Sequence, residues 1–301
     1  MNGWILVGEK SVNLNDLNIF VETFNKMELP LKTVFANQIS ALASNENVVF
    51  VNGKAEELPN FIVSAFFGNN DYHNRSVVKM LESMGVLCIN NYACLIDTCD
   101  KLKSFHLVHE KVKSALLPKT ILYHPSLTED FLNGNIGFPM VVKINHGAKG
   151  AGVELAQNFN HLTNIIAQFQ AEYNDEILLQ EYISSSRGKD LRIILCGGKV
   201  MTSFVRINDT NFKSNLATGG HLQFVTPPGH ILATAKEIAL ALSINLGSVD
   251  FLLGEDDKYY LCEANSMPGL SYVKASGNNG IKNPLEDIVN NIKKQLLATS
   301  I

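Results

Sequence analysis

The sequence lacks several features that would place it in a special class of protein. Its five cysteines form no Cys-x-x-Cys pair, and this odd set argues for reduced thiols in a cytoplasm rather than for a disulfide framework. The start of the chain has no basic segment followed by a long apolar one, so no secretory signal is evident. No apolar run reaches membrane-spanning length. The net charge of −4 gives no electrostatic reason to expect a nucleic acid or an anionic membrane as partner. We therefore expect a cytoplasmic globular protein.

Candidate ligands for a transition metal are also sparse. Cys94 and Cys99 could form half of a metal site, but no second pair of cysteines follows them. His106 and His109 share one face of an expected helix, and no third ligand can be recognised. We interpret the two histidines as surface residues.

The first ninety residues alternate between short apolar strands and helices. Strands are expected over 4–7, 48–51, 61–65 and 86–89, and helices over 14–26 and 74–84. This order is typical of an α/β unit with a parallel sheet. No Gly-x-Gly-x-x-Gly follows the first strand, so a Rossmann dinucleotide site is not supported. Residues 69–71 are interpreted as a turn rather than as a loop that faces a ligand.

A glycine-rich loop lies between two further expected strands, over 138–144 and 153–155. Its glycines are Gly147, Gly150 and Gly152. The backbone N–H groups of such a loop can cover phosphate groups, although glycine-rich hairpins are common. No Gly-x-x-x-x-Gly-Lys-Ser/Thr motif is present, so the loop is not a P-loop. Further elements are expected as helices over 97–110, 162–173 and 234–242, a strand over 177–183, and a hairpin of 189–195 with 199–206.

Two expected strands near the end of the chain carry side chains with oxygen ligands. Asp250 lies on the first strand, and Glu263 and Asn265 lie two residues apart on the second, so that the last two share one face. Carboxylate and amide oxygens of this kind hold Mg²⁺ against phosphates. A polar hairpin face in contact with water is the alternative interpretation of this stretch alone.

The pairing of these strands depends on the turn between them. If residues 254–257 form the turn, Leu253 lies opposite Lys258 and Asp250 lies opposite Leu261. The two carboxylates are then diagonal neighbours on one face of the hairpin.

Taken in order, the polar motifs between about residues 60 and 290 resemble the ATP-grasp superfamily, and within it the RimK-type α-amino-acid (glutamate) ligases and the glutathione-synthetase-like carboxylate–amine ligases. Each motif is short, and their joint order makes the resemblance specific. The motifs are Asp100-Lys101; Phe138-Pro139 with Lys143; the glycine loop 147–152; Gln180-Glu181-Tyr182-Ile183; Gly188-Lys189-Asp190-Leu191-Arg192; Arg206; Phe212-Lys213-Ser214-Asn215 with Gly219-Gly220; Asp250; Glu263-Ala264-Asn265; and Pro268-Gly269.

The resemblance implies an ATP-grasp fold that combines α/β and α+β units. An N-terminal α/β domain would cover residues 1–90, and a central subdomain with the glycine-rich loop would cover 91–180. A C-terminal subdomain with the metal ligands would cover 181–301. ATP would be held between the last two.

The resemblance also implies an activity. The enzyme would be an ADP-forming carboxylate–amine ligase that makes an amide bond through an acyl phosphate, joining an amino acid to a peptide, protein tail, carrier or small amine. ATP and two Mg²⁺ ions, for which Mn²⁺ can substitute, would be the cofactors. We expect a homo-oligomer, no nucleic-acid partner and no membrane partner.

Roles for single residues follow from the same resemblance. ATP would contact Lys101, Lys143, Gly147, Gly150, Gly152, Glu181, Tyr182, Asp190 and Lys213. The metal ligands would be Asp250, Glu263 and Asn265. Arg206 and Asn215 would face the transferred phosphoryl group and the acyl-phosphate oxygens, where a guanidinium suits developing charge. Arg192 is a weaker candidate on the substrate side.

Three departures from the glutamate ligases put the substrate in doubt. The segment between Asp250 and Glu263 is one residue longer than expected, and the segment 206–212 is shorter. The polar stretch 67–74 lacks an expected arginine. The departures leave the ATP chemistry untouched. A D-alanyl-type dipeptide ligase is one alternative, and a non-catalytic ATP-binding regulatory module is another, although the intact set of phosphate, metal and arginine residues argues against the module.

Overall fold

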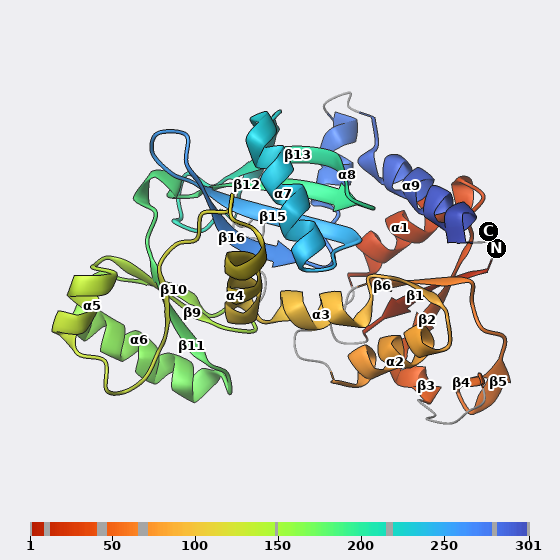
Figure 1. Ribbon diagram of the computed structural model, residues 1–301, viewed down its shortest axis with the longest axis horizontal. Helices are drawn as coiled ribbons and strands as arrows, with labels where there is room; N and C mark the ends of the chain where they lie inside the picture. The colour runs from red at the N-terminus through yellow and green to blue at the C-terminus, as the bar shows by residue number, and fades with distance from the viewer. Residues whose placement is uncertain are drawn as a thin grey trace.

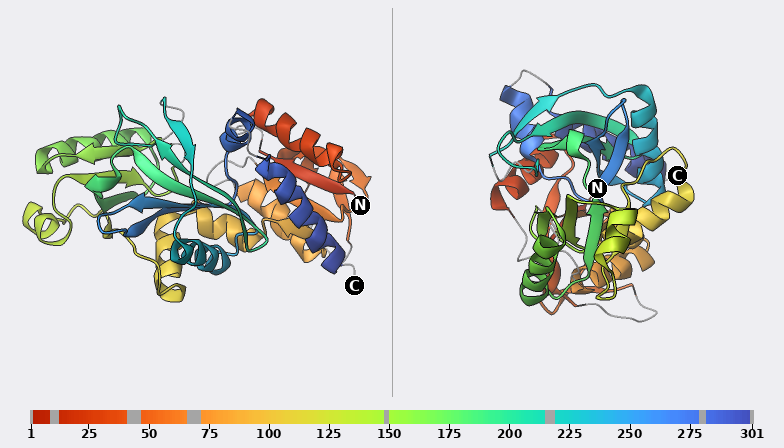
Figure 2. Two further views of the ribbon diagram at one scale, coloured as in Figure 1. Left: turned by 90° about the horizontal axis from the view of Figure 1, so that it is seen from above. Right: turned by 90° about the vertical axis from the view of Figure 1, so that its left-hand side faces the viewer.

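The computed structural model describes residues 2–8, 13–40, 47–65, 72–147, 150–214, 219–278 and 282–299. The turn predicted at 69–71 lies outside them, as does Asn215. Figure 1 shows two units at opposite ends of an elongated molecule, with a third sheet between and above them. Figure 2 confirms that the first and central units lie far apart. Within the described ranges, no helix is both long and apolar enough to cross a membrane.

The first unit is a parallel sheet with the strand order β2-β1-β6-β7. Its strands are β1 (Gly3–Val7), β2 (Leu31–Phe35), β6 (Phe61–Ala65) and β7 (Leu87–Ile89), and its helices are α1 (Leu14–Lys26) and α2 (Tyr72–Ser83). A small antiparallel sheet follows the 3-10 helix η1 (Ala36–Gln38), with strands β3 (Ile39–Ser40), β4 (Val49–Val51) and β5 (Lys54–Glu56). The parallel α/β unit is confirmed, although β2, β3 and β5 were not predicted.

Two helices, α3 (Tyr92–Cys99) and α4 (Lys101–Lys111), connect the first unit to the rest of the chain. The prediction of one continuous helix over 97–110 was wrong. Asp100 adopts an extended conformation, and its carboxylate accepts a hydrogen bond from the backbone N–H of Lys103 at 2.8 Å. Such an N-cap begins a new helix, so Lys101 occupies the first turn of α4.

The central unit is an antiparallel sheet with the strand order β10-β9-β11-β8. Its strands are β8 (Thr120–Leu122), β9 (Met140–Ile144), β10 (Val153–Ala156) and β11 (Ile177–Glu181), which ends two residues before the predicted 183. The helices α5 (Glu129–Asn135) and α6 (Phe159–Glu172) pack on this sheet through a shared apolar core. The opposite face of the sheet is left for the cleft described below.

The third unit is an antiparallel sheet with the strand order β14-β13-β12-β15-β16. Its strands are β12 (Lys189–Cys196), β13 (Lys199–Ile207), β14 (His221–Phe224), β15 (Leu246–Leu253) and β16 (Tyr259–Asn265), preceded by the 3-10 helix η2 (Ser184–Ser186). Helix α7 (Gly229–Ala241) packs on one face, and α8 (Ser271–Asn278) and α9 (Pro284–Thr299) follow the sheet. The predicted hairpin of β12 and β13 is confirmed.

Helix α9 returns to the first unit and lies beside α1, as Figure 1 shows. Leu285, Ile288 and Ile292 join the core that contains Leu17 and Phe20. We propose domain boundaries near residues 90 and 181, with the last helix completing the first unit.

Candidate active site

A cleft between the central sheet and the C-terminal sheet collects most of the predicted site residues. A smaller recess beside it is formed by Asn265 together with Lys101 and Glu263. Asp250 is fully buried just behind these groups. The predicted residues that line the main cleft are Lys101, Lys143, Gly147, Gly150, Glu181, Tyr182, Asp190, Arg206, Lys213 and Glu263.

Lys143 points into the cleft from β9 and is held from two sides. Its Nζ donates to Gln180 Oε1 at 3.0 Å and lies 5.2 Å from the centre of the Phe105 ring. Gln180 is fixed in turn, because its Nε2 donates to Thr120 Oγ1 at 2.8 Å. Burial lowers the pKa of Lys143 to about 8, and the nearby charge of Lys101 acts in the same direction. The position of Lys143 is therefore fixed by its contacts. A bound anion would favour its protonated form.

Lys101 reaches the same space from the first turn of α4. Its Nζ donates to the backbone carbonyls of Asn145 at 3.0 Å and Gly147 at 2.5 Å. Burial lowers its pKa, and the charge of Glu263 opposes that shift. Lys101 thus holds the start of the glycine-rich loop and lies close enough to Glu263 for their charges to interact.

The three glycines of the loop have different reasons to be glycine. Gly147 and Gly150 line the cleft. Gly150 and Gly152 have positive φ angles of 78° and 61°, which favour glycine. A Cβ atom at Gly152 would lie 2.7 Å from the side chain of Ile144, so this residue serves the close packing of the hairpin.

The opposite end of the cleft has apolar and aromatic walls. Tyr182 and Phe212 meet edge to face, with ring centres 6.4 Å apart. Glu181 accepts a hydrogen bond from the backbone N–H of Lys119 at 3.1 Å. Lys213 donates to the carbonyl of Gly150 at 3.3 Å, which joins the C-terminal unit to the glycine-rich loop. Flat apolar walls beside backbone polar groups suit a nucleobase.

Charged residues alternate in sign across one face of the C-terminal sheet. Asp190 pairs with Arg206 across β12 and β13, and Arg192 pairs with Asp250 across β12 and β15. Arg206 Nε donates to Asp190 Oδ1 at 2.7 Å, and Arg206 Nη2 to Asp250 Oδ2 at 2.8 Å. Arg192 Nε donates to Asp250 Oδ1 at 2.8 Å. A guanidinium group therefore balances the negative charge of each of these two buried carboxylates.

The predicted register of the β15–β16 hairpin was wrong. Leu253 lies opposite Tyr259 instead of Lys258, and an irregularity after Asp250 leaves Cys262 as an extra residue on β16. Asp250 therefore lies directly opposite Glu263 rather than diagonal to it. A β-bulge re-aims the side chains that follow it, and here it brings the two carboxylates closer than a regular hairpin would.

Glu263 stays ionised despite its partial burial. Burial alone would raise its pKa, but the charges of Lys101, Arg192 and Arg206 outweigh that effect and lower the pKa to about 2. Asn265 Nδ2 donates to Glu263 Oε1 at 3.2 Å. In that contact the amide nitrogen of Asn265 faces Glu263. The side-chain carbonyl oxygen of Asn265 is left available to bind a cation.

These residues fit a hard divalent cation. The set consists of two carboxylates and one amide, all oxygen donors, beside two lysines that can hold phosphates. Within the described part of the chain, no group of three or more His, Cys, Asp and Glu residues is arranged as a metal site; the set proposed here includes an asparagine as its third ligand. The neighbouring Cys262 lines the cleft, and burial raises the pKa of its thiol to about 12, which keeps it protonated.

Two residues of the site were missed or undervalued in the sequence. Arg192 was only a weak candidate, although its position two residues after Asp190 on one strand places both on the same face. Gln180 was part of a motif but received no role. The sequence pattern that could have identified Gln180 is a side-chain amide on a buried strand that pairs with the strand of Lys143.

Comparisons with known proteins show which family the chain belongs to. Residues 98–288 match the family described as the RimK-like ATP-grasp domain. Proteins named probable alpha-L-glutamate ligase are similar over most of their length. The one from Vibrio parahaemolyticus is 30% identical over 78% of both chains, and the one from Maridesulfovibrio salexigens is 32% identical over 78% of both chains.

Solved structures share the fold. The D-alanine–D-alanine ligase from Bacillus anthracis has a TM-score of 0.67 at 19% identity, over 99% of both chains. The ATP-grasp ligase PsnB, complexed with its minimal precursor, has a TM-score of 0.72 at 12% identity over 98% of both chains. A RimK domain ATP-grasp protein from Sphaerobacter thermophilus has a TM-score of 0.68 at 15% identity, over 96% of this chain and 98% of that one. The fold expected from the sequence is thus confirmed.

Proposed function

Because this chain belongs to the RimK-like ATP-grasp family, and is therefore an ADP-forming carboxylate–amine ligase, we propose that it joins an amino acid to a peptide, protein tail, carrier or small amine through an acyl phosphate. The glutamate ligases that it resembles support an acidic amino acid as one substrate. The observation that carries the proposal is the meeting of Lys101, Lys143 and Arg206 with Glu263 in one cleft.

The reaction would proceed in two steps. A carboxylate oxygen attacks the γ-phosphorus of ATP, and the bond to the β-phosphate oxygen breaks to release ADP. The amine then attacks the acyl carbon, and phosphate leaves with the oxygen that came from the carboxylate. The amine loses one proton when the amide forms. Positioning and charge neutralisation, rather than covalent help from the protein, govern phosphoryl transfer.

The cleft residues would have different roles in phosphate binding and phosphoryl transfer. Lys101 and Lys143 bind the phosphates, with the backbone of Gly147 and Gly150 covering them. Arg206 donates to the oxygens of the transferred phosphoryl group, where negative charge accumulates. Asn215 is proposed for the same role, as the resemblance implies.

The nucleoside end of ATP would lie between the two sheets. Tyr182 and Glu181 border the space for adenine, and Lys213 closes the cleft over Gly150. Asp190 would contact the nucleoside, although in this structure it binds Arg206. Gly152 supports the loop from behind through its packing on Ile144.

Asp250, Glu263 and Asn265 would hold Mg²⁺. When bound, two such ions, or Mn²⁺ in their place, would supply positive charge that offsets the negative charge developing on the phosphates. Glu263 is ionised and ready for a cation, whereas the two oxygens of Asp250 accept from Arg192 and Arg206 in this structure, so these guanidinium groups would have to release Asp250 for it to bind a metal ion.

A D-alanyl-type dipeptide ligase is the second candidate, supported by the shared fold with the Bacillus anthracis enzyme. It would use the same ATP chemistry with a different substrate pocket. The cytoplasmic location and the homo-oligomeric state stay predictions from the sequence.

The test is Mg²⁺-dependent phosphate release from ATP with amino acids and short peptides, supplied singly and in pairs. Release that requires one acid and one amine together would support the ligase and identify both substrates. With that acid labelled by ¹⁸O in its carboxylate, the released phosphate should carry the label. Turnover without label in the phosphate would contradict the acyl phosphate, and the Arg206→Ala variant is the control for contaminating ATPases.

A further inference from the structure

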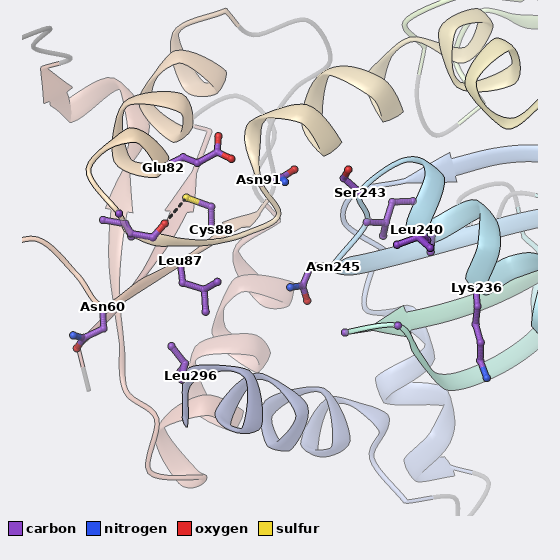
Figure 3. A pocket seen from close by; sticks show the side chains of 16 residues that line it. Asn60, Glu82, Leu87, Cys88, Asn91, Lys236, Leu240, Ser243, Asn245 and Leu296 are labelled. Carbon is purple, nitrogen blue, oxygen red and sulfur yellow. Dashed lines mark hydrogen bonds between the residues drawn. The ribbon is translucent and has the colours of Figure 1, made fainter. Parts of the chain in front are cut away.

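A second and larger cavity, of about 800 Å³, lies between the first and third units and outside the nucleotide cleft (Figure 3). Glu82 and Lys236 are the charged residues of its lining. Oε2 of Glu82 is buried and lies 3.6 Å from Nζ of Lys79, and the ammonium group of Lys236 points away from the cavity in Figure 3. Neither charge is therefore placed to bind a ligand there. The contacts of His146, beside the nucleotide cleft, do indicate a role.

His146 lies between β9 and the glycine-rich loop, directly before Gly147, which lines the cleft. Its backbone N–H donates to Oδ2 of Asp175 at 2.7 Å, and its ring Nδ1 lies 2.7 Å from Oδ1 of Asp175. A carboxylate oxygen accepts hydrogen bonds and donates none, so Nδ1 is the donor. The side chain of Asp175 is only 14% exposed. Asp175 therefore holds His146 at two points, the backbone and the ring.

The other ring nitrogen of His146 faces a second carboxylate. Nε2 lies 3.8 Å from Oδ2 of Asp100, the residue that caps the start of α4. When Nε2 also carries a proton, the ring is a cation between two carboxylates. Lys101 follows Asp100, and its Nζ binds the backbone carbonyls of Asn145 and Gly147, on either side of His146. The residue before the loop is thus enclosed by the contacts of α4 and of Asp175.

Three segments of the nucleotide cleft meet at His146. Helix α4 brings Lys101, the glycine-rich loop brings Gly147, and Asp175 lies just before β11, which ends at Glu181. Each of Lys101, Gly147 and Glu181 is proposed to contact ATP. A binding site whose parts are already held in place costs less ordering free energy when the ligand binds. The contacts of His146 would therefore contribute to the affinity for ATP without touching it.

The charge of Asp175 also reaches the phosphate site. Burial lowers the pKa of Lys101, and the charges of Glu263 and Asp175 oppose that shift. Asp175 thus has two effects on the same site, because it holds the start of the loop through His146 and favours the protonated form of Lys101.

We propose that His146 is a positioning residue for ATP. By binding Asp175, it holds the start of the glycine-rich loop and the carbonyl groups that orient Lys101 in the places that phosphate binding requires. This inference rests on the proposed function, since it takes Lys101 and Gly147 as phosphate contacts.

The experiment is a calorimetric titration of the whole protein with a non-hydrolysable ATP analogue and Mg²⁺. In His146→Asn, the side-chain amide occupies the place of Nδ1 and can donate to Asp175, whereas His146→Leu has no donor. We expect His146→Leu to bind the analogue about tenfold more weakly or worse, and His146→Asn to stay within about threefold of the wild type. A role in packing alone would favour leucine, whose volume is closer to that of histidine.

A double variant tests whether the effect acts through Asp175. Asp175→Ala removes the acceptor of both contacts, so adding His146→Leu to it should weaken the binding of the analogue no further. Urea denaturation establishes that each variant is folded under the conditions of the titration. His146→Gln, whose amide occupies the place of Nε2 instead of Nδ1, replaces His146→Leu if the leucine variant does not fold, with the same expected loss.

His161→Leu is the matched control. His161 lies exposed in α6 of the same unit and accepts from the backbone N–H of Gln157 at 3.4 Å, and it lies outside the lining of the cleft. Its loss removes a histidine and a hydrogen bond to the backbone without touching the start of the loop. The variant should bind the analogue as the wild type does.

The possible failures are distinguishable. If the wild type did not bind the analogue, the proposed function would be wrong, and this inference with it. If the wild type and His146→Leu bound it equally, the proposed function would stand and His146 would have no part in positioning ATP. Equal losses in His146→Asn and His146→Leu, or additive losses in the double variant with Asp175→Ala, would also overturn the inference, because the contact with Asp175 would then not carry the effect.

Discussion

Asp250 lies directly opposite Glu263 on neighbouring strands, and the two carboxylates share a ring of cations. Two ionised carboxylates at this separation would normally raise the pKa of one of them. Here Arg192 and Arg206 bind Asp250, and Lys101 adds its charge near Glu263. Burial still raises the pKa of Asp250, with the two guanidinium groups opposing that shift, whereas the surrounding cations lower the pKa of Glu263 to about 2 and keep it ionised.

The first prediction concerns the metal site. Glu263→Gln removes a charged oxygen ligand while it keeps the shape of the side chain. We expect the Mg²⁺ concentration for half-maximal turnover to rise and the rate to fall by about a hundredfold or more, since even the loss of an outer partner of a metal ligand costs about ten- to a hundredfold. Phosphate release measured across a series of Mg²⁺ concentrations provides the measurement.

Glu255→Gln is the control for this change, because Glu255 lies exposed in the turn of the same hairpin. Its Mg²⁺ dependence should match that of the wild type. If Glu263→Gln kept wild-type turnover under limiting metal and limiting substrate, the assignment of Glu263 as a ligand would be wrong.

The second prediction concerns pH. Lys143 has a pKa of about 8 in the free protein because it is buried. ATP binds the protonated form better, so the affinity for a non-hydrolysable ATP analogue should be highest below pH 8 and should fall as the pH rises through that value. The loss at pH 9.5 should be about ten- to a hundredfold, the worth of a hydrogen bond to a charged group. Calorimetric titrations from pH 7 to 9.5 measure it.

Lys143→Arg separates this lysine from other titrating groups. A guanidinium stays charged over the whole range, so the variant should bind the analogue with a much flatter pH dependence, even if its affinity is lower. An equally flat profile for the wild type would contradict the lowered pKa of Lys143.

The third prediction concerns Arg206, whose proposed contact forms as charge develops on the transferred phosphoryl group. Arg206→Ala should lower kcat by about 10²–10³ while it changes the KM for ATP much less. Steady-state kinetics at saturating Mg²⁺, with ATP varied, measure kcat and the KM for ATP separately. A change in KM with an unchanged kcat would place Arg206 in ground-state binding instead.

Stability must be measured alongside, because Arg206 binds two buried carboxylates. Removing one partner of a buried ion pair costs about 3–5 kcal/mol. Arg206→Lys keeps the charge but loses the bidentate geometry, so it should retain more stability than the alanine variant and still lose kcat.

Local patterns in the sequence were sufficient for most of the elements, whereas the charged residues of the cleft were selected by the resemblance to the ATP-grasp superfamily. The alternation on β12 places Asp190 and Arg192 on one face, and the helix over 14–26 was predicted at its observed bounds. What local patterns could not predict was the extra residue at Cys262, because a bulge breaks the period of two without a sequence signal such as glycine.

Nonlocal packing accounts for the other differences. Asp100 ends one helix and caps the next where Lys101 and the backbone N–H of Leu102 bind Asn145, which lies more than 40 residues further along the chain. Helix α9 completes the core of the first unit, although more than 250 residues separate Ile288 from Leu17. Neither arrangement follows from the residues near these positions in the sequence.

The last prediction concerns the connection between the first and third units. The buried side chain of Asn90 accepts from the N–H groups of Asn245 and Leu246 and donates to the carbonyls of Leu246 and Ser266. Asn90→Ala leaves these groups without partners, so we expect a loss of about 2–4 kcal/mol in the free energy of unfolding, at about 1 kcal/mol for each hydrogen bond. Urea denaturation followed by circular dichroism measures this loss.

Asn91→Ala is the neighbouring control. Asn91 caps α3 by accepting from the N–H of Cys94 at 2.9 Å, and the loss of such a cap costs about 1 kcal/mol. Asn90→Ala should therefore destabilise the protein clearly more than Asn91→Ala does. It should also lower turnover at temperatures where the protein remains folded, because Leu246 begins the strand of Asp250. Equal losses of stability in the two variants, with turnover unchanged, would show that Asn90 does not hold the metal-bearing strand in place.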